Sequence, residues 1–192
     1  MQDILDFYEE VEKTINPPNY FEWNTYRVFK KLGSYKNLVP NFKLDDSGHP
    51  IGNAIPGVED ILVEYEHFSI LIECSLTIGE KQLDYEGDSV VRHLQEYKKK
   101  GIEAYTLFLG KSIDLSFARH IGFNKESEPV IPLTVDQFKK LVTQLKGDGE
   151  HFNPNKLKEI LIKLLRSDLG YDQAEEWLTF IEYNLKHHHH HH

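Results

Sequence analysis

The chain has 192 residues; His187 to His192 form a histidine expression tag, and residues 1–186 are expected to fold as one compact domain. Asp and Glu number 31 against 22 Lys and Arg, a net charge of −9, which disfavours a protein that finds DNA unaided, because DNA affinity depends largely on Lys and Arg at phosphates. No apolar run approaches the roughly 20 residues of a membrane span, and the acidic N-terminal residues lack the basic region of a signal peptide, so we expect a cytoplasmic protein.

The N-terminal part is predicted to contain two helices. Apolar residues at helical spacing predict a first helix whose inward stripe is Ile4, Tyr8, Val11 and Ile15. Asn16-Pro17-Pro18 ends it, and a second helix is predicted from about Asn19 to Leu32, with Gly33 as its C-cap. The expected inward face of this second helix consists of Phe21, Thr25, Val28, Phe29 and Leu32.

Glu22 borders that face near the start of the second helix. From the residues alone, a Glu in the first turn is explained by its favourable interaction with the helix dipole. Alternatively, the Glu22 carboxylate leans over the strand pair predicted in the segment from Pro56 to Ser75. Next along the chain come a short predicted strand within Ser34 to Asn41 and a turn-rich loop from Asp45 to Pro50, which is either a solvated connection or a DNA contact.

The segment from Pro56 to Ser75 is the most informative part of the sequence. Its β-branched and aromatic runs, Ile61 to Tyr65 and Phe68 to Ile72, predict two strands with a reversal at Glu66-His67. Cys74 is the only cysteine, so an internal disulfide and a cysteine zinc cluster are excluded, and we expect it to pack within the second strand.

This hairpin brings two acidic side chains together. If Tyr65 pairs with Phe68, Asp60 lies opposite Glu73, and directly opposed residues share a face with Cβ atoms about 5 Å apart. Two carboxylates at that distance repel by about 3 kcal/mol at an effective dielectric near 20. The pair therefore favours a cation, and two oxygen ligands suit Mg²⁺. The alternative is two solvated strand ends, because Glu-His is not a favoured hairpin turn and a longer loop would shift the register.

The remaining elements alternate between helices and strands. In chain order we predict a helix from about Lys81 to Lys99 ended by Gly101, a core strand Tyr105 to Leu109, a short strand Val130 to Leu133, and a helix Val135 to Leu145 with Thr134 as N-cap. Lys146-Gly147-Asp148-Gly149 is the clearest break. Beyond it, two amphipathic helices carry the stripes Leu157, Ile160, Leu161, Leu164, Leu165 and Trp177, Phe180, Ile181.

These elements predict an α/β fold with α/β/α layering, in which about 150–186 form a C-terminal helical part of the single domain. The C-terminal helices either close the core or face a partner. The sequence contains no Walker loop or dinucleotide fingerprint, so no nucleotide cofactor is expected, and no helix-turn-helix signature with basic flanks. We therefore expect that the chain does not read a DNA sequence itself.

At this point the sequence resembles a known group of enzymes. Pro56-Gly57-x-x-Asp60, a strand pair and Glu73-x-Ser75 are similar to the PD-(D/E)XK nuclease motif. The longer run from Glu73 to Gln82, followed by Glu86 and by Val91-Arg92-His93-Leu94, resembles AlwI-type type IIS restriction endonucleases. Residues 1–186 as a whole resemble the small subunit of a heterodimeric member of that group, whose large partner acts alone as a nicking endonuclease.

The resemblance implies a restriction-endonuclease-like three-layer core with a mixed central sheet. It also implies a Mg²⁺-dependent type II endonuclease that hydrolyses one strand of duplex DNA at a fixed offset from a site read by the large subunit. Its metal ligands would be Asp60, Glu73 and the backbone carbonyl of Cys74, with Glu22 as the helical acid that joins them. From the net charge of −9 and the lack of a DNA-reading element, we expect this chain to bind duplex DNA only weakly alone.

The sequence departs from the motif at Ser75, where the usual pattern has a lysine that orients the attacking water. Lys81, Gln82 or Glu86 on the following helix are candidates to replace it, because a carboxylate or an amide can orient water and a carboxylate can accept its proton. We predict Glu86 and Gln82 as site members and give His93, which shares their helix face, a secondary place.

Three other functions remain open. One is a non-catalytic interaction subunit whose acidic pair is a relic, and another is a soluble metal-binding protein without nuclease activity. The third is a stand-alone PD-(D/E)XK nuclease of the repair type. Convergence of Glu22 and Glu86 on Asp60 discriminates against a relic, because a relic has no need for additional acids.

Overall fold

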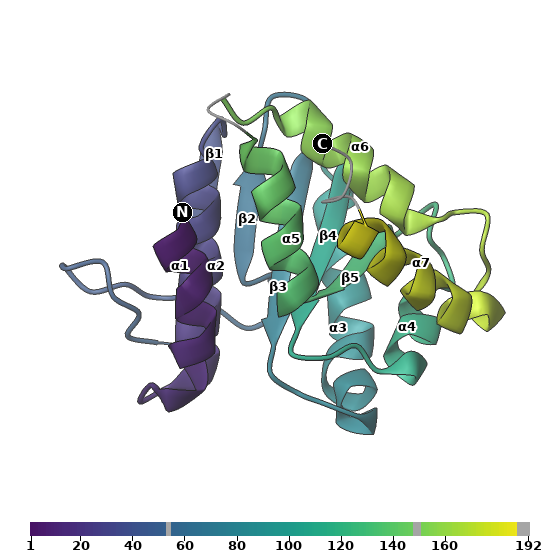
Figure 1. Cartoon of the computed structure of the whole chain (residues 1–192), viewed down its shortest axis with the longest axis horizontal. Helices are drawn as coiled ribbons and strands as arrows, with labels where there is room; N and C mark the ends of the chain where they lie inside the picture. The colour runs from purple at the N-terminus through teal and green to yellow at the C-terminus, as the bar shows by residue number, and fades with distance from the viewer. Residues whose placement is uncertain (53–54, 148–150, 188–192) are drawn as a thin grey trace.

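A five-stranded mixed sheet in the order β1-β2-β3-β4-β5 forms the centre of the computed structural model, which describes residues 1–52, 55–147 and 151–187 (Figure 1). The β1–β2 and β2–β3 pairs are antiparallel, whereas the β3–β4 and β4–β5 pairs are parallel. The strands are β1 (Asn37–Pro40), β2 (Ile61–Glu64), β3 (Ser69–Ser75), β4 (Ala104–Gly110) and β5 (Val130–Thr134). This arrangement confirms the predicted mixed sheet.

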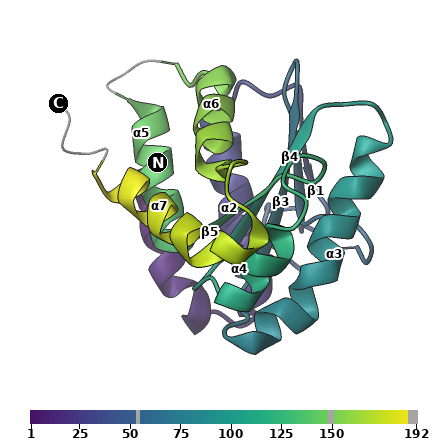
Figure 2. The same cartoon turned by 90° about the vertical axis from the view of Figure 1, so that its right-hand side faces the viewer.

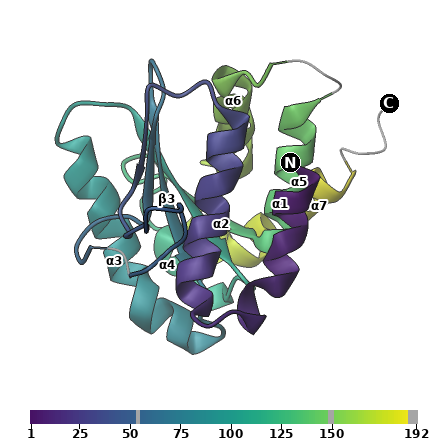
Figure 3. The ribbon, with the colours of Figure 1, turned by 90° about the vertical axis from the view of Figure 1, so that its left-hand side faces the viewer.

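Helices cover both faces of the sheet, as the two side views show (Figures 2 and 3). α2, α5 and α6 lie on one face, and α3 lies on the other with α4 packed beside it. The helices are α1 (Gln2–Phe7), α2 (Pro17–Leu32), α3 (Glu80–Lys98), α4 (Leu115–Ile121), α5 (Val135–Lys146), α6 (Pro154–Leu165) and α7 (Ala174–His187), with short 3₁₀ helices at Tyr8–Lys13 and Tyr171–Gln173. The predicted α/β/α layering is confirmed. None of the helices in the described ranges has the length and hydropathy of a membrane span.

Local sequence signals place the elements that frame the sheet. α2 begins with Pro17 at its first position and ends at Gly33, whose φ of +74° suits a residue without a side chain. α5 begins at Thr134, which forms a capping box with Gln137. All seven residues of β4 are buried, because this strand has a strand on either side and helices over both faces.

The β2–β3 hairpin has the predicted register. Glu64 pairs with Ser69 and Ile61 with Ile72, and the chain reverses at Glu66-His67, where the Tyr65 N–H donates to the Phe68 carbonyl at 2.9 Å. The regular ladder ends at Ile61–Ile72, one pair short of Asp60 and Glu73. Asp60 therefore lies just beyond the β2–β3 ladder, whereas Glu73 is still paired with Phe108 of β4.

Two features of the fold differ from the sequence-based expectation. The first helix loses α-helical geometry after Phe7 and continues as a 3₁₀ helix to Lys13, so Ile15 is 95% exposed and its predicted place in the inward stripe is wrong. The sequence analysis also placed no element between β4 and β5, where the structure has α4. That helix spans seven residues, too few for a clear apolar period, although Asp114 marks its start by accepting the Ser116 N–H.

The two C-terminal helices close the core of the domain. The fully buried Trp177 of α7 donates its indole N–H to the Leu164 carbonyl of α6 at 2.8 Å, and the Lys125 ammonium group lies 3.7 Å from its ring centroid. Ile160 and Phe180, in the predicted stripes, are half-buried, and the other members of those stripes are buried. Of the predicted break at Lys146 to Gly149, Asp148 and Gly149 lie outside the described residues.

Trp177→Ala should destabilise the whole domain rather than the C-terminal helices alone. Truncating a fully buried Trp costs about 3–5 kcal/mol, which corresponds to a fall in Tm of roughly 10 °C for a chain of this size. Circular dichroism and intrinsic fluorescence during heating should report one coincident transition at a lower temperature. Ile162→Ala, at a position that is 47% exposed on α6, is the control and should leave Tm nearly unchanged. Two separate transitions in the wild type would contradict a single domain.

Candidate active site

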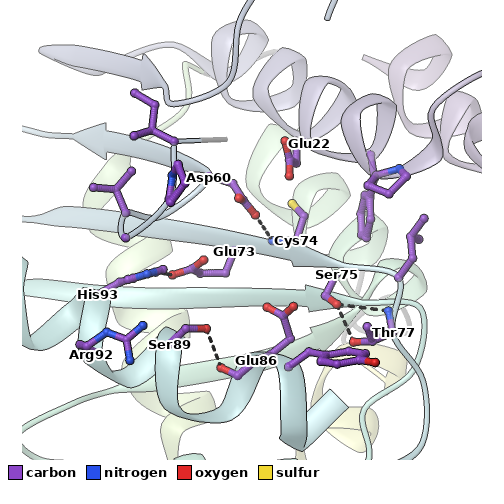
Figure 4. A pocket seen from close by; sticks show the side chains of 18 residues that line it. Glu22, Asp60, Glu73, Cys74, Ser75, Thr77, Glu86, Ser89, Arg92 and His93 are labelled. Carbon is purple, nitrogen blue, oxygen red and sulfur yellow. Dashed lines mark hydrogen bonds and ion pairs between the residues drawn. The ribbon is translucent and has the colours of Figure 1, made fainter. Parts of the chain in front are cut away.

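A cavity of about 630 Å³ opens where the end of the β2–β3 hairpin meets α2 and α3 (Figure 4). Residues 55–58, which lead into β2, form part of its wall. In the part of the chain that the structure describes, four carboxyl groups line it: Glu22, Asp60, Glu73 and Glu86. The structure thus brings together every acidic residue that the sequence analysis placed in the site, from three different elements and the segment before β2.

Asp60 is fixed by the backbone of the hairpin. The Cys74 N–H donates to its Oδ2 at 2.7 Å, and the Asp60 N–H donates to the Ile72 carbonyl at 3.1 Å. Burial raises the pKa of Asp60 from 3.8 to about 7, and the bond from Cys74 acts in the opposite direction. Asp60 is therefore held in one place while its proton is retained to near neutral pH.

Glu22 reaches the cavity from α2 and points toward Asp60 and Cys74 (Figure 4). Its side chain is buried, and its Oε2 has no hydrogen-bond partner among the described residues. Burial first, and then the nearby Asp60, raises the pKa of Glu22 to about 9. A buried oxygen without a partner is costly, so this atom marks a position where a donor or a cation would be favourable.

Glu73 turns toward α3 and forms a hydrogen bond with His93, with Oε2 and Nδ1 2.7 Å apart. Both side chains are buried. Burial raises the pKa of Glu73 and lowers the pKa of His93, so both shifts favour a hydrogen bond between neutral groups over an ion pair. His93, which the sequence analysis gave only a secondary place in the site, directly contacts the predicted metal ligand Glu73.

One face of α3 forms a wall of the cavity. Glu86 and His93 lie on this face, and burial raises the pKa of Glu86, which the Ser75 hydroxyl partly opposes. Ser89 and Arg92 share the face and were not assigned to the site from the sequence. The signal that identifies them is their spacing, because Ser89 follows Glu86 by three residues and Arg92 follows Ser89 by three, and residues three and four apart lie on one side of a helix.

Gln82 does not line the cavity. It is fully buried, and its amide donates to the carbonyls of Thr77 at 3.2 Å and Ser112 at 2.8 Å and accepts the Asp114 N–H at 2.8 Å. Its polar atoms are occupied in joining the loop after β3 to the loop after β4. Gln82 therefore supports the loops behind the cavity and is not placed to contact a substrate.

The structure also shows the surroundings of Ser75, the residue that stands where the resembling motif has a lysine. Ser75 lines the cavity, and its hydroxyl lies 2.6 Å from the Thr77 hydroxyl. Lys81, the other candidate to replace the lysine, is exposed and does not line the cavity. This part of the cavity wall thus carries hydroxyl groups and no positive charge.

The turn-rich loop from Asp45 to Pro50 lies against α2. The Trp23 indole N–H donates to the Gly48 carbonyl at 2.7 Å, and its ring stacks on His49 with centroids 5.7 Å apart. Trp23 directly follows Glu22 in α2, so one helical turn carries both a cavity acid and the anchor of the loop. A contact between this loop and DNA stays a prediction.

The donors in the cavity fit a hard divalent cation. No three His, Cys, Asp or Glu side chains of the described ranges are grouped closely enough to form a complete metal site. Mg²⁺ does not require one, because it binds through one or two carboxylates and keeps water in the rest of its shell. The available atoms are carboxylate oxygens, including the unpaired oxygen of Glu22. Burial raises the pKa of the Cys74 thiol, so it stays protonated and is a poor metal ligand.

Comparison with known protein families gives a match over residues 7–141, described as AlwI restriction endonuclease. The matched range includes the four cavity acids and ends within α5, before α6 and α7. A comparison with curated proteins finds no match. Because the family match covers more than half of the chain, the protein belongs to the AlwI restriction endonuclease family, whose members are DNA-cleaving hydrolases.

Proposed function

We propose that this chain is the Mg²⁺-dependent catalytic small subunit of a heterodimeric type IIS restriction endonuclease. It would hydrolyse one strand of duplex DNA at a fixed offset from a site that a separate large subunit reads. Family membership supports DNA cleavage, and the metal, the subunit role and the single cut strand are our proposals. A cytoplasmic location is part of the same proposal.

The observation that carries the proposal is the convergence of four acids on one cavity within the family range. A relic of an active site has no need for Glu22 and Glu86 to approach Asp60. Burying several carboxyl groups together is unfavourable, and structures retain such arrangements mainly at functional sites. The convergence therefore favours an active nuclease over an inactive interaction subunit or a simple metal-binding protein.

The residues present suggest a division of roles. Asp60 and Glu73 would hold Mg²⁺, with the Cys74 backbone carbonyl and Glu22 as further oxygen donors. When bound, Mg²⁺ would stabilise the charge that develops on the phosphate and favour deprotonation of the attacking water. Glu86 reaches the cavity from α3 and would accept the proton of that water. His93 would orient Glu73 through their hydrogen bond.

The net charge supports the role of a subunit delivered to DNA by another chain. With 31 acidic residues against 22 basic ones, the protein has a net charge of −9 that opposes binding to phosphates. A large subunit would supply phosphate contacts and base readout. The two chains need not associate stably in solution, because a small interface completed only on DNA would suffice.

Asp60→Asn and Glu73→Gln should each reduce DNA cleavage at least about 100-fold, because each removes a carboxylate charge from the proposed metal site. Both substitutions retain an oxygen that can accept the hydrogen bond from Cys74 or His93, so the fold should be unchanged by circular dichroism. Asp84→Asn is the matched control, because Asp84 is exposed on α3 and outside the cavity. Near-normal cleavage by Asp60→Asn with Mg²⁺ as the only added metal would overturn the site assignment.

Cleavage of a cognate duplex labelled on each strand should depend on the large subunit. Alone, this chain should cut neither strand efficiently; with the large subunit, each chain should cut one strand and produce a double-strand break. Gel analysis of both labels measures the two cuts separately. Absence of the second cut in the mixture would favour the non-catalytic interaction subunit. Site-specific double-strand cleavage by this chain alone would instead indicate a stand-alone nuclease.

The metal-free protein should become less stable as pH rises. A carboxyl group whose pKa is higher in the folded protein adds stability below its ordinary pKa, and this contribution is lost as pH rises through the folded-state value. For Asp60 the loss falls between about pH 4 and about pH 7, and Glu22 extends it toward about pH 9. Denaturation in EDTA should show a smaller loss over this range for Asp60→Asn than for the wild type.

A stability measurement also tests Mg²⁺ binding without a cleavage assay. Above about pH 7, where Asp60 is ionised, added Mg²⁺ should raise the Tm of the wild type, because a ligand that binds only the folded state stabilises it. Asp60→Asn should show little increase. An equal increase in both proteins would exclude Asp60 as a ligand.

A further inference from the structure

One basic side chain at the cavity has no assigned role. Arg92 is the only Lys or Arg among the described residues that line the cavity. It is exposed, and it extends from the same face of α3 as Ser89 and His93 (Figure 4). Its position is therefore at the solvent side of a site whose acids lie deeper.

The Arg92 guanidinium also lacks a protein partner. Within the described ranges it makes no hydrogen bond, ion pair or ring contact. Its positive charge lowers the pKa of the adjacent His93, after the larger effect of burial. Elsewhere on the surface, Arg166 is paired with Asp168 and Lys111 with Glu12. A guanidinium group has five N–H donors in a planar fork, and those of Arg92 are available to a ligand.

The nature of that ligand follows from the charges around it. Four carboxyl groups line the cavity, and among the described lining residues Arg92 alone is a permanently charged cation, so it is the protein group there that attracts an anionic DNA strand. Ser75 provides no charge at the motif position of the lysine. An Arg fork matches two oxygens of a phosphate and binds them with charge-assisted hydrogen bonds.

We propose that the Arg92 guanidinium binds a backbone phosphate of the DNA strand that enters the cavity. The proposal rests on the proposed endonuclease function and adds a substrate-binding group to it. Arg92 fixes the position of the strand at the entrance, and the acids act on the phosphate that this position presents to them. Arg92 does not take over proton transfer, because a guanidinium group remains protonated at all working pH values.

DNA binding in the absence of metal provides the direct test. Fluorescence anisotropy of a labelled duplex, titrated with the full chain in EDTA over a range of low salt concentrations, yields both affinity and its dependence on salt. Arg92→Ala should weaken binding about tenfold, as expected for hydrogen bonds between charged groups. It should also reduce the slope of log affinity against log salt by about 0.9, the value for one lost phosphate contact.

Two variants separate a contact from a general effect of charge. Arg92→Lys should retain the salt slope but bind more weakly than the wild type, because it keeps the charge and loses the fork. Arg119→Ala removes the same charge from an exposed position on α4, outside the cavity, and should change neither quantity. An equal effect of Arg119→Ala and Arg92→Ala would show that only net charge matters and would overturn the contact.

Single-turnover cleavage with the large subunit completes the test. Arg92→Ala should raise the DNA concentration for the half-maximal rate about tenfold, and saturating DNA should restore most of the rate. If the wild type cleaves DNA but Arg92→Ala leaves both the affinity and the salt slope unchanged, the Arg92 proposal is overturned and the endonuclease function stays intact. Failure of the wild type to cut would overturn the proposed function, whereas failure of the wild type to bind the duplex in EDTA would overturn the Arg92 contact.

Discussion

Repulsion between carboxyl groups in a confined space is the constraint on which this structure depends. Two ionised groups about 4 Å apart repel by about 4 kcal/mol at an effective dielectric of 20, and burial makes each group harder to ionise. The protein without metal meets this constraint by protonation, since burial, the larger cause, and then the neighbouring carboxyl groups raise the pKa of Asp60 and Glu22. A site of this kind keeps its shape through the backbone and hydrogen bonds around the acids. The Cys74 N–H and the His93 ring provide that support.

The layers of the fold place the four cavity acids close together. β3 is central, so it contributes Glu73 from a strand that is paired on both sides, whereas the β2 ladder ends before Asp60, whose carboxyl group accepts the Cys74 N–H instead. α2 and α3 approach from opposite faces of the sheet and add Glu22 and Glu86 where the ladder stops. The amide of Gln82 then holds the loops after β3 and β4 together. Each acid is thus positioned by a different element, and the arrangement depends on the whole domain.

Sequence patterns predicted what depends on local spacing and failed where tertiary contacts decide. The β-branched and aromatic runs with a reversal at Glu66-His67 predicted the hairpin register correctly, and with it the positions of Asp60 and Glu73 opposite each other. The same reasoning assigned Gln82 to the site from its face on the helix, because no pattern indicates that its amide is occupied by two loops far apart in sequence. It also left Arg92 without a role, since a basic residue on an acidic helix normally indicates only a solvated surface.

The attachment of the Asp45–Pro50 loop to α2 joins that loop to the acidic cavity through a single helical turn. Glu22 and Trp23 are consecutive residues, and Trp23 holds the Gly48 carbonyl while Glu22 extends over Asp60. No residue from Asp45 to Pro50 lines the cavity. Any effect of a ligand held by the loop on the position of Glu22 therefore passes through this one turn of α2.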